Sequence, residues 1–199
     1  MTEKKDNSDI IGIVIYGRGG QGAVTASQII AEAAFLSGNF ADVHAFPSFG
    51  AERRGAPVQV YAKLSKVQKI WDRSQIEHPD IIIVFDETFL TQNIVSSLKP
   101  KGFFIINSEK EPAALKNQYN LNEDTKIVVA NISKMVLENN LVFEGIPVVN
   151  IPILGLLSKA LPELNLENLK KVVIKRLGEN LAKLNIELIE QGFKLAKTL

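Results

Sequence analysis

The sequence predicts an α/β fold: a three-layer, Rossmann-like domain with a largely parallel sheet and C-terminal helices. Short apolar runs rich in β-branched residues recur along the chain, which is typical of strands buried on both faces of a parallel sheet. Segments with helical character lie between these runs, as in α/β proteins. A glycine-rich segment follows the first apolar run, where such folds turn from strand into helix.

The amino-terminal part is expected to contain a flexible, charged tail at 1–9, followed by a single domain at 10–199. Residues 10–16 are predicted to form a buried strand. A helix is predicted at 23–37, because alanine, isoleucine and leucine dominate this segment and Gly38 stands where glycine commonly ends a helix.

Further strands are predicted after this helix. The strand at 58–64 alternates between apolar and polar residues, which indicates a half-buried, antiparallel strand. Residues 141–152 contain two prolines and show no clear period. The other strands are expected at 42–46, 80–85, 102–107 and 126–130.

The second half of the chain is expected to supply most of the helices. A helix is predicted at 87–98, and another runs to 139 with Asn131 as its cap. After Pro162 the leucines recur at helical spacing, and Gly178 interrupts them. Two terminal helices are therefore predicted.

Composition limits what the chain can do. Its 199 residues, hydrophobic fraction of 46% and net charge of +1 are those of an ordinary globular domain without the basic excess of a nucleic-acid binder. It contains no cysteine and only two histidines, so it cannot hold an iron–sulfur cluster, and no metal site is expected. No signal peptide or membrane span is recognisable. We therefore expect a cytoplasmic protein with neither a membrane nor a nucleic-acid partner.

A glycine loop of the form G-x-G-x-x-G stands between the first strand and the first helix. Glycines permit positive φ and let a ligand approach the backbone, and the helix start offers free N–H groups to an anion. A phosphate or pyrophosphate is the predicted ligand, with the arginine as a mobile cation beside it. The alternative is that the glycines serve only tight packing. The loop comprises Gly17, Arg18, Gly19, Gly20, Gln21 and Gly22.

A simple dinucleotide interpretation of this loop has a defect. A ribose-binding acidic residue is expected about 20 residues further on, at the carboxyl end of the second strand. Asp42 has the right sequence distance, but it stands at the start of that strand. Nicotinamide binding is therefore disfavoured.

A second loop, at 49–57, is expected to lie at the carboxyl end of the sheet, beside the glycine loop. It carries the candidate ligand residues Glu52, Arg53, Arg54 and Gly55. Paired arginines suit bidentate recognition of phosphate, and the glutamate can orient one guanidinium. The alternative is a surface ion-pair cluster or an inter-subunit salt bridge.

Three other residues attract attention. Asp86 and Asn107 end predicted strands at the edge of the sheet where ligands bind in open α/β folds, although helix capping explains them equally well. Trp71 can anchor a partner chain or pack locally. No nucleophile with its base and no acid/base dyad is recognisable, so no catalytic residue is expected in this chain.

The two loops together closely resemble those of the gamma subunits of pyruvate:ferredoxin oxidoreductase (pyruvate synthase). The resemblance rests on Gly17-Arg18-Gly19-Gly20-Gln21-Gly22-Ala23-Val24-Thr25-Ala26 and Phe49-Gly50-Ala51-Glu52-Arg53-Arg54-Gly55-Ala56-Pro57. Shorter or weaker matches extend it over essentially the whole chain, at 70–76, 79–80, Asp86, 150–155 and 185–195.

This resemblance implies a role in oxidative decarboxylation of a 2-oxoacid. Such complexes use thiamine diphosphate and Mg²⁺, pass electrons through iron–sulfur clusters to ferredoxin or flavodoxin, and transfer the acyl group to coenzyme A (CoA). The work is shared among alpha, beta, gamma and delta chains, and the gamma chain is associated with CoA binding and with closing the assembly. The second loop favours pyruvate. The alternatives are 2-oxoglutarate or a branched-chain 2-oxoacid, a free-standing NAD(P)-binding oxidoreductase, and a regulatory module that responds to a nucleotide or CoA.

Overall fold

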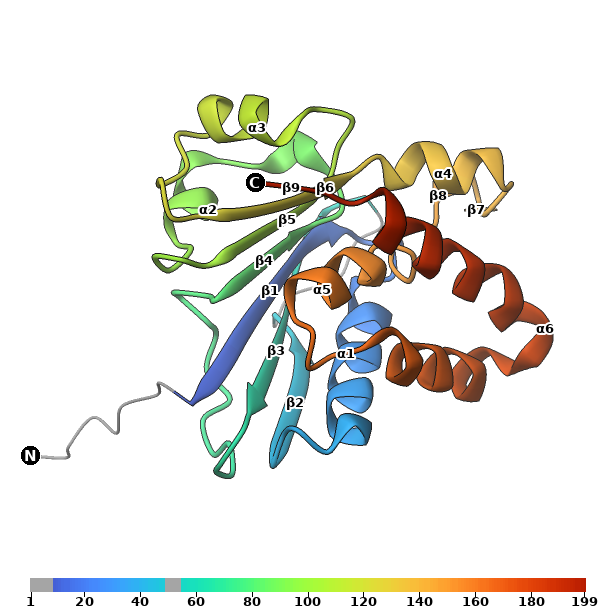
Figure 1. Cartoon of the computed structure of the whole chain (residues 1–199), viewed down its shortest axis with the longest axis horizontal. Coiled ribbons are helices and arrows are strands. Elements are labelled where there is room, and N and C mark those ends of the chain that lie inside the picture. The colour runs from blue at the N-terminus through green and yellow to red at the C-terminus, as the bar shows by residue number, and fades with distance from the viewer. Residues whose placement is uncertain (1–8, 49–54) are drawn as a thin grey trace, which may run out of the picture.

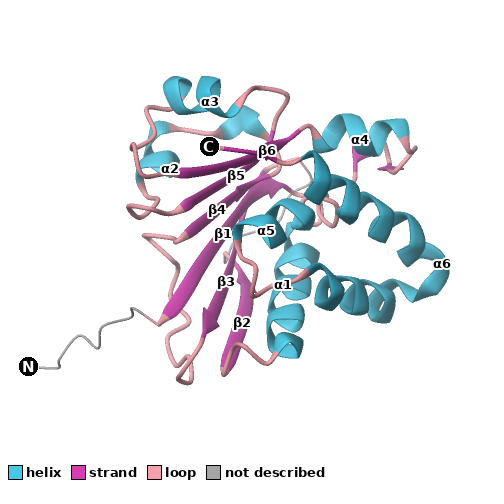
Figure 2. Ribbon diagram, in the orientation of Figure 1, coloured by secondary structure: helices cyan, strands magenta, loops and turns pink. Residues whose placement is uncertain are grey.

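The computed structural model of the chain describes residues 9–48 and 55–199, so the expected tail lies almost wholly outside it. A seven-stranded sheet carries helices on both faces (Figure 1, Figure 2). Its four central strands are parallel, and the apolar runs that form them are buried, as predicted. They are β1 (Ile10–Arg18), β4 (Ile81–Val84), β5 (Phe103–Asn107) and β6 (Lys126–Ala130).

The edges of the sheet are antiparallel. β3 (Pro57–Ser65) pairs antiparallel with β1, as predicted, and β2 (Asp42–Pro47) pairs antiparallel with β3. At the other edge the short strand β9 (Lys197–Thr198) pairs antiparallel with β6. The strand order is β2-β3-β1-β4-β5-β6-β9, and the predicted α/β fold with a mostly parallel sheet is confirmed.

Two hydrophobic cores separate three layers. Along β1, Ile13 and Ile15 pack into one core and Val14 into the other, because successive side chains of a strand point to opposite faces. Among the described residues, no helix combines the length and apolar character that a membrane crossing requires. The core around Ile13 and Ile15, called the first core, includes side chains of α1 (Ala23–Ser37), α5 (Leu154–Ala160) and α6 (Leu166–Leu195). The core around Val14, called the second core, includes side chains of α2 (Gln92–Ser96) and α3 (Pro112–Gln118).

The prediction of one helix at 87–98 is wrong. The chain forms a single 3₁₀ turn, Glu87–Phe89, and then α2. The Asp86 side chain accepts from the backbone N–H of Thr88, and the Thr91 side chain accepts from that of Ile94. These two local caps start two separate helical turns, and helical spacing does not reveal the break between them.

Other differences come from long-range packing. The strand predicted to be half-buried is buried on both faces over its second half, because Phe46 of β2 packs against Tyr61 and Asp72, in the segment after β3, contacts Lys63. The sequence did not indicate α5, β9 or the hairpin of β7 (Val142–Phe143) and β8 (Ile146–Pro147). Asn131 caps α4 (Ile132–Glu138) as predicted.

Glycines shape the last two helices. Gly178 has φ 73° and ψ 159° and divides α6 into two helical parts, as its position predicted. α5 and the second part of α6 meet backbone to backbone. A Cβ on Gly155 would stand 2.2 Å from the carbonyl oxygen of Ile189, and one on Gly192 would stand 2.8 Å from that of Pro152. Only glycine permits this close approach.

Candidate functional site

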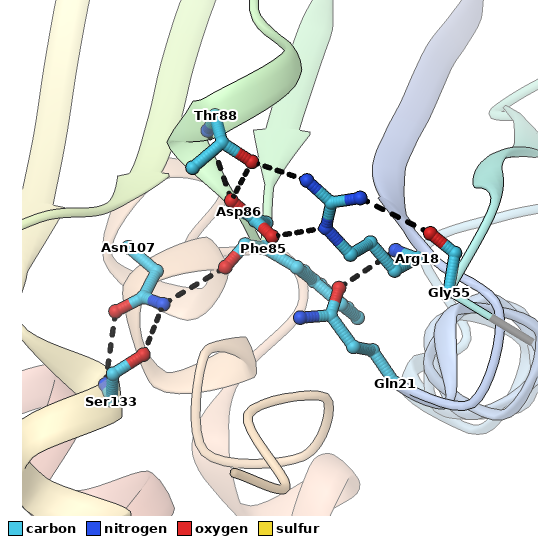
Figure 3. Close-up of polar contacts among 8 residues, drawn as sticks. All are labelled: Arg18, Gln21, Gly55, Phe85, Asp86, Thr88, Asn107 and Ser133. Carbon is cyan, nitrogen blue, oxygen red and sulfur yellow. Dashed lines mark hydrogen bonds and ion pairs between the residues drawn. The ribbon is translucent and has the colours of Figure 1, made fainter. Parts of the chain in front are cut away.

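The site lies at the switch point of the sheet. After β1 the chain turns to one side to build β2 and β3, and after β4 it builds β5 and β6 on the other. The carboxyl ends of β1 and β4 therefore border a crevice, which is where open α/β sheets bind ligands. The glycine loop and the residues that follow β4 meet there (Figure 3).

The glycine loop leaves the start of α1 open. Gly20 has φ 96° and Gly22 has φ 78°, conformations that side-chain-bearing residues rarely adopt. Gly22 is the cap residue of α1 and offers no side-chain acceptor, and the first turn of the helix contains no acidic residue. Among the described residues, no side chain therefore caps the N–H groups at the positive dipole end of this 15-residue helix.

Gln21 holds the loop in shape. The side-chain Oε1 of Gln21 accepts from the backbone N–H of Arg18 at 2.7 Å, and the backbone N–H of Gln21 donates to the Arg18 carbonyl at 3.0 Å. Gly17 packs against the Phe85 ring, where an added Cβ would stand 3.2 Å from Cδ2. The loop is therefore preorganised before any ligand binds.

Arg18 is not the mobile cation that the sequence suggested. Its Nε donates to Asp86 Oδ2 at 2.6 Å, Nη1 to the Gly55 carbonyl at 3.1 Å and Nη2 to Thr88 Oγ1 at 2.5 Å. This arrangement, the Arg18 clasp, joins the end of β1, the segment just before β3 and the turn after β4 (Figure 3). Because Asp86 neutralises its charge, the guanidinium positions the loops and contributes little net charge to an anion site.

Asp86 is held in its charged form. Burial favours the neutral carboxyl, but hydrogen bonds from Thr88 and Arg18 outweigh burial and keep the pKa of Asp86 below its ordinary value of 3.8. The residue also caps the 3₁₀ turn. The capping interpretation is thus confirmed, and a direct contact with a ligand stays a prediction.

Stability is expected to fall in acid partly through Asp86. A carboxylate whose folded-state pKa is depressed stabilises the fold above its unfolded-state pKa, and this contribution is lost as the pH falls below about 4. Urea unfolding followed by circular dichroism between pH 6 and pH 2 measures it. The variant Asp86→Asn should show a shallower decline below about pH 4 than the wild type. Identical pH profiles would contradict the assignment.

Asn107 is fully engaged within the protein. Its Nδ2 donates to the Phe85 carbonyl at 2.9 Å and to Ser133 Oγ at 2.8 Å, and its Oδ1 accepts from the Ser133 N–H at 3.0 Å. It therefore joins the ends of β4 and β5 to the first turn of α4 (Figure 3). This favours the capping interpretation, while contact with a ligand remains untested.

A cavity of about 330 Å³ opens beside the glycine loop. Its walls carry two carboxylates together with amide and hydroxyl groups, so they favour uncharged groups that donate hydrogen bonds. The crevice thus has an anion-attracting part at the start of α1 and a part that suits neutral polar groups. The cavity is lined by Gln21, Phe85, Asp86, Glu87, Thr88, Asn107, Ser133, Pro147 and Val149.

Asn150 is a site residue that the sequence did not single out. It is 6% exposed, and its Nδ2 donates to the Gly22 carbonyl at 3.3 Å. A Cβ on Gly22 would stand 2.2 Å from Nδ2, so glycine is required there for steric reasons as well. Oδ1 of Asn150 is buried and finds no donor among the described residues. The weak match at 150–155 was the only signal for this residue.

The second loop approaches the glycine loop as predicted, as far as it is described. The N–H of Gly19 donates to the Ala56 carbonyl at 2.9 Å, and the N–H of Gly55 donates to the Gly19 carbonyl at 3.0 Å. Glu52, Arg53 and Arg54 lie outside the described residues. The described residues Gly55 and Ala56, which follow them in the chain, are the ones hydrogen-bonded to Gly19.

Asp42 lies at the amino end of β2, at the opposite end of the sheet from the crevice. β2 runs in the same direction as β1, so its first residue is far from the end of β1. Its Oδ2 accepts from the backbone N–H of Ile70 at 2.7 Å, a structural contact. The acidic residue at the dinucleotide spacing is therefore remote from the crevice, which weighs against a nicotinamide cofactor.

Comparison with known proteins gives a consistent result. The family model for pyruvate ferredoxin/flavodoxin oxidoreductase matches residues 12–195. Pyruvate synthase subunit PorC of Methanosarcina barkeri is 38% identical over 81% of this chain and 83% of its own length. The pyruvate/ketoisovalerate oxidoreductases common subunit gamma of Thermococcus litoralis is 35% identical over 93% and 96%.

Solved structures agree. Pyruvate oxidoreductase subunit PORC of Thermotoga maritima is 31% identical, with a TM-score of 0.79 over 96% of this chain and 98% of that one. The 2-oxoglutarate:ferredoxin oxidoreductase of Magnetococcus marinus shares the fold at 22% identity, with a TM-score of 0.74, and this chain covers 31% of it.

Fold and site define an α/β protein that presents a preorganised, uncapped helix start at the switch point of its sheet, in the manner of Rossmann-like domains. The chain belongs to the pyruvate ferredoxin/flavodoxin oxidoreductase family, and it matches the gamma-type subunits of that family over nearly their whole length. The resemblance inferred from its two loops is confirmed.

Proposed function

We propose that this chain is the gamma subunit of a cytoplasmic pyruvate:ferredoxin or flavodoxin oxidoreductase, and that it holds CoA at the switch point. The complex converts pyruvate and CoA into acetyl-CoA and CO₂, and the two electrons released reduce the acceptor. The observation that carries the proposal is the uncapped start of α1, preceded by a glycine loop to which the end of the second loop is hydrogen-bonded, in a chain of this family.

The resident cofactors of such a complex do not fit this chain. It has no cysteine for an iron–sulfur cluster. The described residues contain no group of three or more histidine, aspartate or glutamate side chains that could hold a metal ion. Thiamine diphosphate, Mg²⁺ and the clusters are therefore assigned to alpha-, beta- and delta-type partner chains, and no chemical step is assigned to a residue here.

The charge balance of the crevice indicates how CoA is held. The pyrophosphate suits the N–H groups at the start of α1. A helix dipole equals only about half a unit charge, and Asp86 neutralises Arg18. Arg53 and Arg54 are therefore needed as phosphate ligands, the 3′-phosphate being the natural partner of one. The uncharged amide portion of CoA suits the neighbouring cavity, whose walls are rich in acceptors.

Calorimetric titration of the 199-residue chain with CoA tests the assignment. Arg53→Ala and Arg54→Ala should each weaken binding about tenfold or more, since a hydrogen-bonded charge pair contributes roughly 1.5–3 kcal/mol. Lys171→Ala, on the exposed face of α6, is the control and should bind like the wild type. NADH should not bind. Equal CoA affinity in all variants would remove the arginines from the phosphate site.

The choice of 2-oxoacid is assigned to the partner chains. Relatives such as that of Thermococcus litoralis are named as a gamma subunit common to pyruvate and ketoisovalerate oxidoreductases. A subunit shared by two enzymes cannot by itself distinguish their substrates. This favours a second candidate function for the present chain, service in a branched-chain 2-oxoacid oxidoreductase, with the same CoA site.

A further inference from the structure

A short extended segment after β3 presents the single tryptophan of the chain to solvent. Alternate residues of an extended chain point to opposite sides. Ile70 is 4% exposed and faces inward, whereas Trp71 is 85% exposed. Lys69 and Arg73 are exposed on either side of it, and Lys69 Nζ lies 5.9 Å from the centroid of the indole ring. We call residues 69–73 the Trp71 strap.

The Trp71 strap is anchored to the sheet on both sides of the tryptophan. On one side, the N–H of Ile70 donates to Asp42 Oδ2 at 2.7 Å. On the other, the buried ammonium of Lys63 donates to both the carbonyl and the carboxylate of Asp72, each at 3.0 Å. Hydrogen bonds from Ser74 and then Lys63 lower the pKa of Asp72 to about 2, so this carboxylate stays charged. The indole is thus exposed on a preorganised backbone.

A hollow lies next to the strap. Its volume is about 540 Å³, and Ile10, Gly12 and Ile76 give it a partly apolar floor, with Glu77 and His78 among its polar walls. A projecting aromatic ring beside a hollow suits a protein partner, because binding hot spots are aromatic or arginine anchors that fit pockets on the opposing surface. Preorganisation also lowers the entropy lost on binding.

The charges around the indole indicate the chemistry of the partner. Lys63 neutralises Asp72, and Lys99 neutralises Asp80 at 2.9 Å. Lys69 and Arg73 have no ion pair with a described carboxylate, so the outward charge of the Trp71 strap itself is positive, whereas the wall of the hollow carries the exposed carboxylate of Glu77. A second copy of this chain would bring the same cations face to face in a symmetric contact. A partner with carboxylates around an apolar slot fits instead.

We propose that the Trp71 strap is the docking anchor for another protein chain of the oxidoreductase complex. That chain receives the indole in an apolar slot flanked by carboxylates for Lys69 and Arg73. This inference rests on the proposed function for the existence of the complex. The hollow is lined by the start of β1 and by Asp80, just before β4. Docking there leaves the crevice at the carboxyl ends of the same strands open to CoA.

Affinity for the rest of the complex tests the proposal. The chain is titrated onto the co-purified partner chains, and the dissociation constant is measured by interferometry. Trp71→Ala should weaken assembly about 30-fold or more, the effect of a hot-spot residue. Arg73→Glu should weaken it and reduce its dependence on salt. Leu181→Ala, which removes an apolar side chain 68% exposed on α6, is the matched control and should assemble normally.

Two readouts separate this proposal from the proposed function. Trp71→Ala should keep the thermal midpoint and the CoA affinity of the isolated chain, because the indole is exposed and remote from the crevice. With 5-fluorotryptophan incorporated, the chain gives one ¹⁹F resonance, which should shift when partners are added. If Trp71→Ala assembles normally, the docking role of the Trp71 strap is refuted, while the proposed function is unaffected. If the wild-type chain binds no partners, or self-associates through Trp71, the docking proposal falls, and in the former case the proposed function falls with it.

Discussion

Replacing Gly155 with alanine is expected to lower the free energy of unfolding by about 3 kcal/mol or more, because overpacking typically costs about 1–3 kcal/mol and occasionally more. The added Cβ would stand 2.2 Å from the Ile189 carbonyl oxygen and 2.7 Å from the Phe193 nitrogen. Both are backbone atoms of α6, so no side-chain rotation relieves the clash. The helices would have to separate, and the first hydrophobic core would open with them.

Urea unfolding followed by circular dichroism measures this effect. Gly38→Ala is the matched control. Gly38 also has positive φ, 72°, but no atom lies within 4 Å of its added Cβ, so the substitution should cost only about 1 kcal/mol of backbone strain. If Gly155→Ala is no more destabilising than Gly38→Ala, the close contact between α5 and α6 is refuted.

Arg18→Met is expected to have the second large effect, on binding more than on stability. It removes all three contacts of the Arg18 clasp and leaves the Asp86 carboxylate without its cation. Breaking a fully buried pair costs about 3–5 kcal/mol. Here the side chains of Arg18 and Asp86 are 37% and 20% exposed, and solvent screening reduces the expected loss to about 1–3 kcal/mol. CoA affinity should fall at least tenfold, because the three loops around the crevice are no longer held together.

Arg176→Met provides the control for the clasp. Arg176 Nε lies 2.9 Å from Glu32 Oε2, with side-chain exposures of 32% and 21%, so this pair resembles the Arg18–Asp86 pair in burial, although Glu32 also pairs with Lys175. It joins α6 to α1 away from the crevice. Its loss should destabilise the chain to a similar or smaller degree and leave CoA affinity unchanged. If both variants weaken CoA binding equally, the effect is one of general stability, and the clasp has no positioning role.

Local patterns predicted the frame of the site but not its internal contacts. Glycines between a buried strand and a helix indicated the loop, and the positive φ of Gly20 and Gly22 confirms that steric reason. The Arg18 clasp joins residues 68 positions apart. Charged side chains carry no sequence signal for such pairing, so Arg18 was predicted to be mobile. Asn150 reaches Gly22 across 128 positions and escaped notice for the same reason.

Tertiary context also decided the elements that were missed. β9 consists of two residues, and only its pairing with β6 makes it a strand. Tyr61 and Lys63 alternate like solvent-facing residues, yet Phe46 of β2 packs against Tyr61 and the segment after β3 covers Lys63. The helix predicted at 87–98 failed because two capping side chains, Asp86 and Thr91, compete locally with helix continuation. The periodicity of hydrophobic residues alone reveals neither such tertiary contacts nor such local capping.

We propose that this chain supplies the CoA site of a complex whose oxoacid chemistry lies on its partners. Steady-state kinetics of the assembled complex carrying Arg53→Ala and Arg54→Ala together test this claim most directly. The KM for CoA should rise about tenfold or more, as expected for lost phosphate contacts, while the KM for pyruvate stays that of the wild type. An unchanged KM for CoA, or an equal rise in both constants, would contradict the claim.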